Sequence, residues 1–313
     1  MKKPLKIAIV TVAALVATPV LLVATTATVN AVATSSETSS IADYGERVTV
    51  DGRRMNVLVS GDHEQTIVLL PGLGTTAPAL DFEPLIDELD ETYRVVAVEP
   101  FGTGLSDQTD VPRTAENITL EVHEALQQLG VDRYVLMGHS IAGVYALAYT
   151  AAYPDEVVAF VGIDSSVPDQ PGSEEPIPSE ALVLLSDLGI TRALQSIAPD
   201  PYEGADYDEE TVERMRGLAA RNATAPTLVD EMDRAVRNFA DVSGTTFAHE
   251  LPVLLFVVAD EEEVDGWVEL HERQAASVDR GEVVLLEGDH YLHRTRSPEI
   301  AAETGRFLEQ LAR

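Results

Sequence analysis

A serine stands between an apolar run and a helix-compatible run near the middle of the chain. Ser140 lies in the sequence GHSIAG at residues 138–143, after the apolar residues 134–137 and before residues 144–153, which suit a helix. Small residues around a serine at such a junction are typical of a tight, strained turn that exposes the hydroxyl at the edge of a sheet. Ser140 is therefore a candidate nucleophile, and helix capping is the bland alternative for it.

A histidine near the C-terminus could supply the base that this serine needs. His290 follows the apolar run 283–286, in the sequence GDH at residues 288–290. A serine hydroxyl is a poor nucleophile at neutral pH, and a neighbouring imidazole can accept its proton. His293 is a weaker candidate for the same role, and we interpret His139, next to the serine, as structural.

Apolar runs alternate with helix-compatible runs beyond residue 44. The predicted strands are 47–50, 55–59, 66–70, 94–98, 134–137, 157–163, 253–259 and 283–286. Strands that alternate with helices indicate an α/β fold with a mostly parallel, doubly wound sheet of about eight strands. Residues 165–250 show no strand pattern and are rich in Pro, Asp and Glu, so we expect a helical lid there, inserted after the sixth strand and above the strand ends.

The N-terminus bears on where the protein resides. Its three lysines lie within the first six residues, the run 7–23 is apolar, and no charged residue follows before Glu37. Residues 31–33 read Ala-Val-Ala, a signal-peptidase pattern, yet the apolar run is also long enough to span a bilayer. Because the lysines precede this run, the domain after it is expected outside the cytoplasm, either secreted or anchored.

These observations divide the chain into five parts. They are 1–33, a signal peptide or membrane anchor; 34–43, a linker; 44–164, the first part of the core; 165–250, the helical lid; and 251–313, the second part of the core.

Composition excludes several classes of function. The chain has 313 residues, a formal net charge of −32 and no cysteine. The absence of cysteine excludes disulfides, a thiol nucleophile and cysteine-bound metals. The acidic balance argues against nucleic acid and anionic membrane surfaces as partners, so membrane contact is expected only through the N-terminal segment. The glycine-rich turns lack a P-loop lysine and no cluster has metal-ligand spacing, so we expect neither cofactor nor metal.

Four short motifs together resemble the α/β-hydrolase superfamily. They are PGLG at 71–74, GTGLS at 102–106, GHS at 138–140 and GDH at 288–290. The resemblance extends from residue 44 to the C-terminus, apart from the segment 165–250. It implies the α/β-hydrolase fold in its serine-nucleophile branch, although a motif set of this kind names no substrate.

The resemblance also implies roles for individual residues. Ser140 would be the nucleophile, His290 the general base, and the backbone N–H groups of Leu73 and Ile141 the oxyanion hole. The usual G-x-S-x-G pattern carries Ala142 at its fifth position here. Alanine is small enough for the strand and helix to approach each other, so the departure should be tolerated.

The acid of the triad remains open at this point. Asp164 closes the apolar strand 157–163, and a carboxylate placed there needs a partner because burying it alone is costly. Asp260 follows the strand 253–259, where the family usually places its acid, but it begins a run of four acids with Glu261, Glu262 and Glu263. Such runs are more often solvated, so Asp164 is preferred and Asp260 is the alternative.

The sequence thus predicts a carboxylesterase-like serine hydrolase. Its substrate would be a small or medium apolar acyl compound, cleaved through an acyl-enzyme. An acyltransferase or a carbon–carbon hydrolase with the same triad, and a non-catalytic ligand-binding protein of the same fold, are the alternatives.

Overall fold

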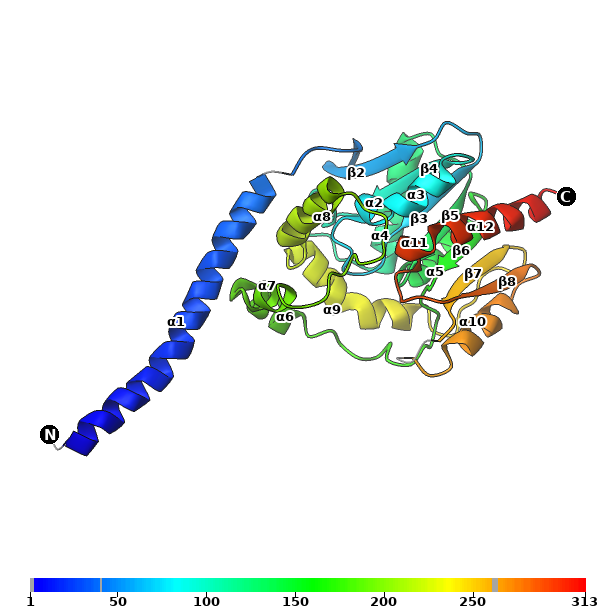
Figure 1. Cartoon of the computed structure of the whole chain (residues 1–313). Coiled ribbons are helices and arrows are strands. Elements are labelled where there is room, and N and C mark those ends of the chain that lie inside the picture. The colour runs from blue at the N-terminus through cyan, green and yellow to red at the C-terminus, as the bar shows by residue number, and fades with distance from the viewer. Residues whose placement is uncertain (1–2, 40, 261–263) are drawn as a thin grey trace.

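The structure is a computed structural model that describes residues 3–39, 41–260 and 264–313. An eight-stranded sheet runs through the molecule (Figure 1). The strands are β1 (Glu46–Val50), β2 (Arg53–Ser60), β3 (Thr66–Leu70), β4 (Arg94–Glu99), β5 (Tyr134–His139), β6 (Val157–Ile163), β7 (Val253–Val258) and β8 (Gly281–Leu286). Their spatial order is β1-β2-β4-β3-β5-β6-β7-β8. The pairs β1–β2 and β2–β4 are antiparallel, and the other five pairs are parallel. The sheet confirms the predicted α/β-hydrolase fold.

Twelve helices are described, and they surround the sheet or project from it. They are α1 (Lys3–Ser39), α2 (Pro78–Asp81), α3 (Glu83–Leu89), α4 (Ala115–Gln128), α5 (Ala142–Ala152), α6 (Ser179–Asp187), α7 (Ile190–Gln195), α8 (Glu209–Asn222), α9 (Pro226–Asp241), α10 (Trp267–Ala275), α11 (Leu292–Thr295) and α12 (Ser297–Leu311).

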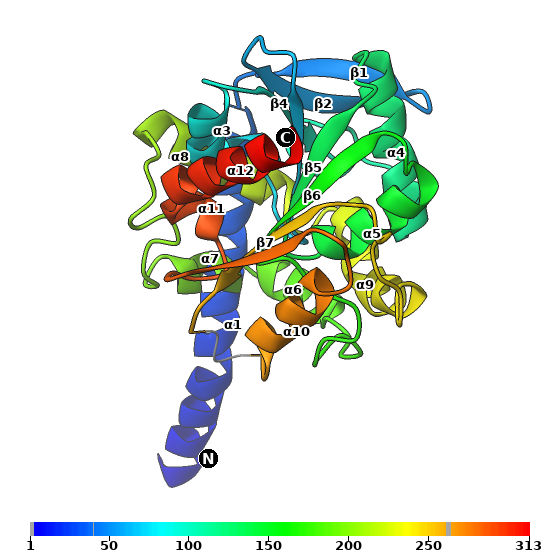
Figure 2. The ribbon, with the colours of Figure 1, turned by 90° about the vertical axis from the view of Figure 1, so that its right-hand side faces the viewer.

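Side chains alternate between the two faces of the sheet, and this alternation explains why the central strands read as continuous apolar runs. In β3, Ile67 and Leu69 join the core that α3 and α12 cover, while Val68 and Leu70 join the core that α4, α5 and α10 cover. Strands buried on both faces are apolar at every position. Figure 2 shows these helices on opposite sides of the sheet.

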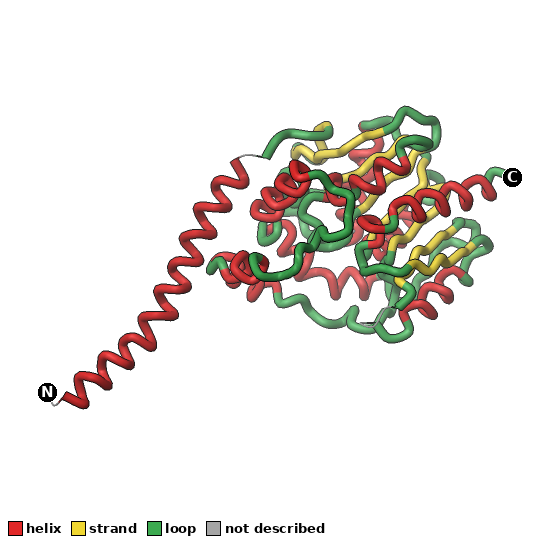
Figure 3. The backbone as a smooth tube through the Cα atoms, in the orientation of Figure 1, coloured by secondary structure: helices red, strands yellow, loops and turns green. Residues whose placement is uncertain are grey.

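Four helices, α6 to α9, interrupt the alternation between β6 and β7 (Figure 3). We call residues 165–250 the insertion. Its helix α9 reaches the loops at the carboxyl ends of the strands, because a Cβ on Gly102 would lie 2.7 Å from the Cβ of Thr227. The insertion therefore packs directly onto the edge of the sheet where ligands bind in folds of this type.

Helix α1 is 37 residues long and projects from the body of the molecule (Figure 1). Its segment Ala17–Ser39 is the one described helical stretch that is long and apolar enough to cross a membrane. The C-terminal half of α1 lies against α8, α7 and α6 of the insertion. The stretch 34–43, expected to be a linker, continues this helix as far as Ser39.

Candidate active site

Ser140 sits on a sharp turn between β5 and α5, in the left-handed region of backbone space with φ of 54°. Small neighbours make this turn possible. A Cβ on Gly138 would lie 2.8 Å from the Cβ of Ala142, and one on Gly143 would lie 2.2 Å from the carbonyl oxygen of Ser166. Position 143 therefore excludes a side chain, while alanine fits at position 142. Left-handed backbone costs a non-glycine residue about 1–2 kcal/mol, so the turn keeps Ser140 under strain.

His290 lies beside this serine, although 150 residues separate the two in the chain. The distance from His290 Nε2 to Ser140 Oγ is 2.9 Å. The histidine follows β8 in the loop before α11, and its side chain is 40% exposed. An imidazole at this distance can accept the hydroxyl proton when Ser140 attacks a substrate.

Asp164 occupies the other side of the His290 ring. Its Oδ2 lies 2.6 Å from His290 Nδ1, and its side chain is 1% exposed. The second oxygen, Oδ1, accepts hydrogen bonds from Trp267 Nε1 at 2.7 Å and from the Val258 backbone N–H at 3.1 Å. Asp164 also has a left-handed backbone, with φ of 42°. The strain and the two donors aim one carboxylate oxygen at the histidine.

The alternative acids are not brought to His290 in the same way. Asp260 follows β7 and is exposed to solvent, while the hydrogen bond of His290 Nδ1 goes to Asp164. Glu261, Glu262 and Glu263 lie outside the described residues. The geometry thus places Asp164, the preferred candidate, in line with Ser140 and His290.

The turn after β3 packs against Ser140. A Cβ on Gly72 would lie 2.8 Å from His139 Nδ1 and 2.9 Å from the Cβ of Ser140. This close approach carries the next residue, Leu73, to the serine, while Ile141 follows the serine directly. Within the described ranges, no hydrogen bond occupies the backbone N–H of Leu73 or of Ile141. Both groups are thus available as donors.

His139 holds the loop that carries the base. Its Nε2 lies 2.9 Å from the carbonyl oxygen of His290. Because a carbonyl only accepts, Nε2 carries the proton. The ring centroid lies 4.6 Å from the centroid of His290, to which it is tilted, and 4.6 Å from that of His293, which it meets edge-on. Burial, with added repulsion from His293 and His290, holds the pKa of His139 well below its usual value. His139 is thus a neutral, buried support for the His290 loop.

His293, the weaker candidate for the base, is engaged elsewhere. It is fully buried and lies 2.7 Å from Asp81 of α2. Arg294 contacts the other oxygen of Asp81 at 2.6 Å. Burial would raise the pKa of Asp81, but its contacts with His293 and Arg294 outweigh burial and leave the pKa below its ordinary value. This cluster fixes α11 to α2 beneath the His290 loop.

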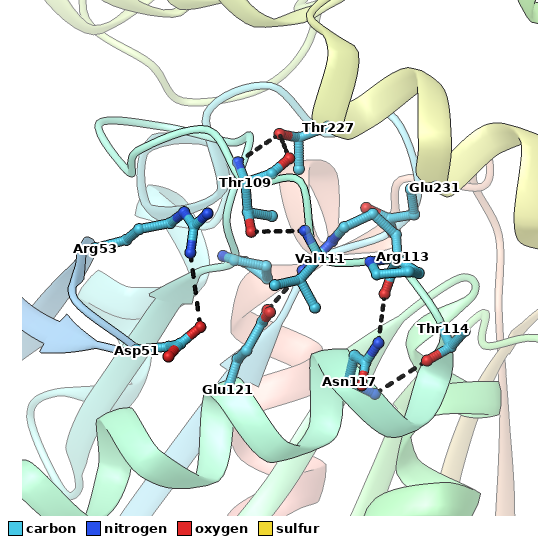
Figure 4. A network of polar contacts seen from close by, with 12 residues as sticks. Asp51, Arg53, Thr109, Val111, Arg113, Thr114, Asn117, Glu121, Thr227 and Glu231 are labelled. Atoms are coloured by element: carbon cyan, nitrogen blue, oxygen red, sulfur yellow. Dashed lines mark hydrogen bonds and ion pairs between the residues drawn. The ribbon is translucent and has the colours of Figure 1, made fainter.

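A buried arginine connects helix α9 of the insertion with helix α4 (Figure 4). Arg113 has no exposed side-chain area, and its Nη1 donates to Glu121 of α4 at 2.6 Å. Its backbone N–H donates to Asp230 of α9 at 2.7 Å. Burial raises the pKa of Glu121 and of the neighbouring Glu231, and the charge of Arg113 opposes both shifts. Arg113 therefore compensates two acids that the fold buries.

A small cavity of about 10 Å³, roughly the room of one water molecule, lies between the turn at Pro71 and Gly72 and α9. Leu70, Ile118 and Leu228 give it apolar walls, and Tyr145 donates a hydrogen bond to Glu231 on its rim at 2.7 Å. Among the residues that the structure describes, no group of three His, Asp or Glu side chains is arranged to hold a metal ion.

The sequence predicted Ser140 and His290 as a pair, but it did not predict that Trp267 would contact this site. Trp267 donates to Asp164 from α10, across 103 residues of sequence. The only sequence signal was that Trp267 is the single tryptophan of the chain. That signal does not indicate which residues Trp267 contacts, so its contact with Asp164 could be identified only from the structure.

Comparison with known proteins agrees with the fold. The sequence matches the alpha/beta hydrolase family over residues 67–303. The uncharacterized protein YbdG of Bacillus subtilis is 23% identical over 290 residues, which cover 88% of this chain and 89% of YbdG. The 2-hydroxy-6-oxononadienedioate/2-hydroxy-6-oxononatrienedioate hydrolase of Klebsiella pneumoniae is 25% identical over 200 residues, or 61% of this chain and 69% of that enzyme.

Solved structures show the same architecture. A protein described as a membrane phospholipase A and bacterial virulence factor is 20% identical and superposes with a TM-score of 0.63. The match covers 99% of this chain and 99% of that one. An eight-stranded sheet, a serine on the turn after its fifth strand and a family match over most of the sequence lead to one conclusion: this chain belongs to the alpha/beta hydrolase family.

Proposed function

We propose that the protein is a serine hydrolase that cleaves a small or medium apolar ester, or a related acyl compound, through an acyl-enzyme. The observation that carries this proposal is the continuous hydrogen-bonded line from Ser140 Oγ through His290 to Asp164, with distances of 2.9 and 2.6 Å. Each group has the type and the neighbour that acyl transfer requires.

In the proposed reaction, Ser140 Oγ attacks the carbonyl carbon of the substrate while its proton passes to His290 Nε2. The negative charge that develops on the carbonyl oxygen is met by the N–H groups of Leu73 and Ile141. His290 then returns the proton to the leaving alcohol, and the acyl-enzyme remains. Water attacks next, His290 accepts a proton from it, and the acid leaves as Ser140 recovers its hydrogen.

Each group would contribute a definite share of the rate. General base catalysis of this kind contributes about 10²–10⁴-fold. Loss of one oxyanion donor typically costs about 10²–10³-fold in kcat. Asp164 would keep the Nδ1 proton in place and stabilise the imidazolium that forms on His290. The preference for an apolar substrate is supported by the apolar side chains of Leu70, Ile118 and Leu228, which lie around the turn at Pro71 and Gly72.

A second candidate is the hydrolysis of a membrane-borne ester. Two observations favour it: the apolar segment Ala17–Ser39 of α1 and the full-length match to a protein described as a membrane phospholipase A. The lysines before the apolar run would place the domain outside the cytoplasm, with α1 as an anchor. A long-chain ester presented in vesicles, compared with a short p-nitrophenyl ester in solution, separates the two substrate classes.

The experiment that tests the proposal is labelling with a fluorophosphonate probe, which reacts only with an activated serine. We expect one label per chain, no label on Ser140→Ala, and hydrolysis of p-nitrophenyl butyrate by the unaltered protein alone. Thermal unfolding of both proteins controls for loss of fold. Absence of labelling in a folded protein would favour the non-catalytic binder. Labelling without ester hydrolysis would favour an acyltransferase or a carbon–carbon hydrolase.

A further inference from the structure

The outer helices of the insertion expose an unusual share of large apolar side chains. We call this set the insertion tip: Leu182, Leu184, Leu185, Leu194 and Ile197. Leu184 is 57% exposed, Leu194 58% and Ile197 81%. Outside the tip and α1, the large apolar side chains exposed within the described part of the chain are Leu120, Leu285 and Tyr291. Exposed apolar groups gathered in one place mark a contact surface.

The tip is fastened to α1 by specific polar contacts. Arg192 of α7 donates to both carboxylate oxygens of Glu37 at 2.7 Å and to Asn30 Oδ1 at 2.9 Å. Thr26 Oγ1 donates to the Leu188 carbonyl at 2.7 Å. These bonds join the middle and end of α1 to the α6–α7 pair. A bidentate arginine–carboxylate pair fixes orientation as well as distance.

A glycine allows the two segments to meet. Gly189, between α6 and α7, has φ of 70°, and a Cβ there would lie 2.3 Å from the Thr26 carbonyl oxygen. Gly172, elsewhere in the insertion, has φ of 80° but nothing within 4 Å of its Cβ position. An alanine at either position suffers the same backbone strain, but only one at Gly189 collides with α1.

These contacts also indicate which part of α1 lies in lipid. Thr26 and Glu37 are bound to the insertion, so of the stretch Ala17–Ser39 only the part before Thr26 is available to lipid, together with the apolar residues that precede it. The segment available to lipid is therefore 7–24, the apolar run 7–23 and Ala24. Eighteen helical residues extend about 27 Å, close to the roughly 30 Å of a hydrocarbon core. The run therefore ends where the α6–α7 pair begins to contact α1, and Figure 1 shows α6 and α7 beside the middle of this helix.

From this arrangement we infer that the insertion tip rests on the surface of the bilayer that α1 crosses, and that the clamp between Arg192 and Glu37 holds it there. The surrounding protein is strongly acidic, with a net charge of −32, so the lipid it contacts is zwitterionic rather than anionic. This inference goes beyond the proposed reaction and does not depend on it.

The absence of cysteine permits a direct test with single fluorescent labels. The full chain carrying Ile197→Cys or Leu120→Cys is labelled with bimane and reconstituted into phosphatidylcholine vesicles that contain a doxyl-labelled phosphatidylcholine. Leu120 is 54% exposed on α4, away from α1, and serves as the matched control. We expect at least threefold stronger quenching of the label at position 197 than at position 120. Equal quenching would overturn the inference.

The attachment of the α6–α7 pair to α1, of which the Arg192–Glu37 pair is a part, is tested by adding Gly189→Ala or Gly172→Ala to the Ile197→Cys protein. We expect Gly189→Ala to reduce the quenching at least twofold and Gly172→Ala to leave it unchanged. If Gly189→Ala also leaves it unchanged, α1 does not hold the tip at the membrane. Hydrolysis of a soluble ester should persist in both variants, which controls for folding. Quenching is measured without turnover, so the same quenching is expected in a chain that also carries Ser140→Ala. A failure of the membrane inference can therefore be distinguished from a failure of the proposed reaction.

Discussion

Replacing Asp164 by asparagine isolates the contribution of the acid. The Trp267 and Val258 N–H groups both donate to Oδ1. In Asp164→Asn these two donors retain the amide oxygen, so the amide NH₂ faces His290. Nδ1 of His290 must then accept a hydrogen bond, and its proton moves to Nε2. A histidine protonated on Nε2 cannot accept the proton of Ser140.

The magnitude of the loss follows from the geometry. With charge centres roughly 4 Å apart and an effective dielectric constant of about 20, the carboxylate stabilises the imidazolium by about 4 kcal/mol. This energy corresponds to about 10³-fold in rate. The His290 side chain is 40% exposed, and solvent screening weakens the interaction. We therefore expect kcat to fall by about 10²–10³-fold, with KM nearly unchanged.

The assay is hydrolysis of p-nitrophenyl butyrate, combined with the rate of fluorophosphonate labelling. Asp260→Asn is the matched control because it makes the same substitution at the alternative acid, and an exposed substitution should alter activity less than about twofold. Thermal unfolding shows whether each variant retains its fold. The assignment fails if Asp260→Asn loses as much activity as Asp164→Asn, or if folded Asp164→Asn keeps more than a tenth of the original rate.

Two further predictions concern stability. Arg113→Met removes the charge that compensates buried Glu121 and Glu231, so we expect the free energy of unfolding in urea to fall by about 3–5 kcal/mol. Arg237→Met, which breaks an exposed ion pair with Asp241, should cost less than about 1 kcal/mol; similar losses in both would show that Arg113 compensates nothing. His139→Gln tests pH dependence. Because the pKa of His139 is depressed in the folded protein, its contribution to stability is present above about pH 6.5 and is lost as pH falls toward the depressed pKa. Between pH 7.5 and 5.5 the unaltered protein should lose about 1.4 kcal/mol more than His139→Gln; parallel curves would contradict a depressed pKa.

Much of the fold was predictable because the local signals agree with one another. Strands buried on both faces must be apolar throughout, and the glycine-rich motifs mark the turns that follow them. The eight predicted strands correspond to β1–β8: β3 and β6 have the predicted bounds, and no end of the other strands differs by more than two residues. Ser140 was identifiable because its strained turn requires small neighbours, and those neighbours are visible in the sequence.

The acid was harder to predict because its position depends on contacts across the sheet. Asp164 and Asp260 both follow apolar strands, so the local sequence treats them alike. What distinguishes Asp164 is the pair of donors from Trp267 and Val258, about a hundred residues away. The catalytic roles of these residues remain predictions that the proposed variants test.

The length of α1 could not be read from composition. Residues 34–39 are almost entirely serine and threonine, which are weak helix formers, and they were expected to belong to a linker. In the structure they are helical, and Glu37 within them is bound by Arg192 of the insertion. A tertiary contact of this kind can outweigh a weak local helix propensity, and it cannot be predicted from the local sequence.

The backbone of Ser140, with its φ of 54°, lowers the stability of the fold while it exposes the hydroxyl. Glycine adopts that conformation without penalty, whereas a serine there destabilises the native state by about 1–2 kcal/mol. A library screened only for thermostability would therefore enrich glycine at this position and lose the hydroxyl that we propose as the nucleophile. Substitutions meant to raise the thermal stability of this protein should therefore leave the turn after β5 unchanged.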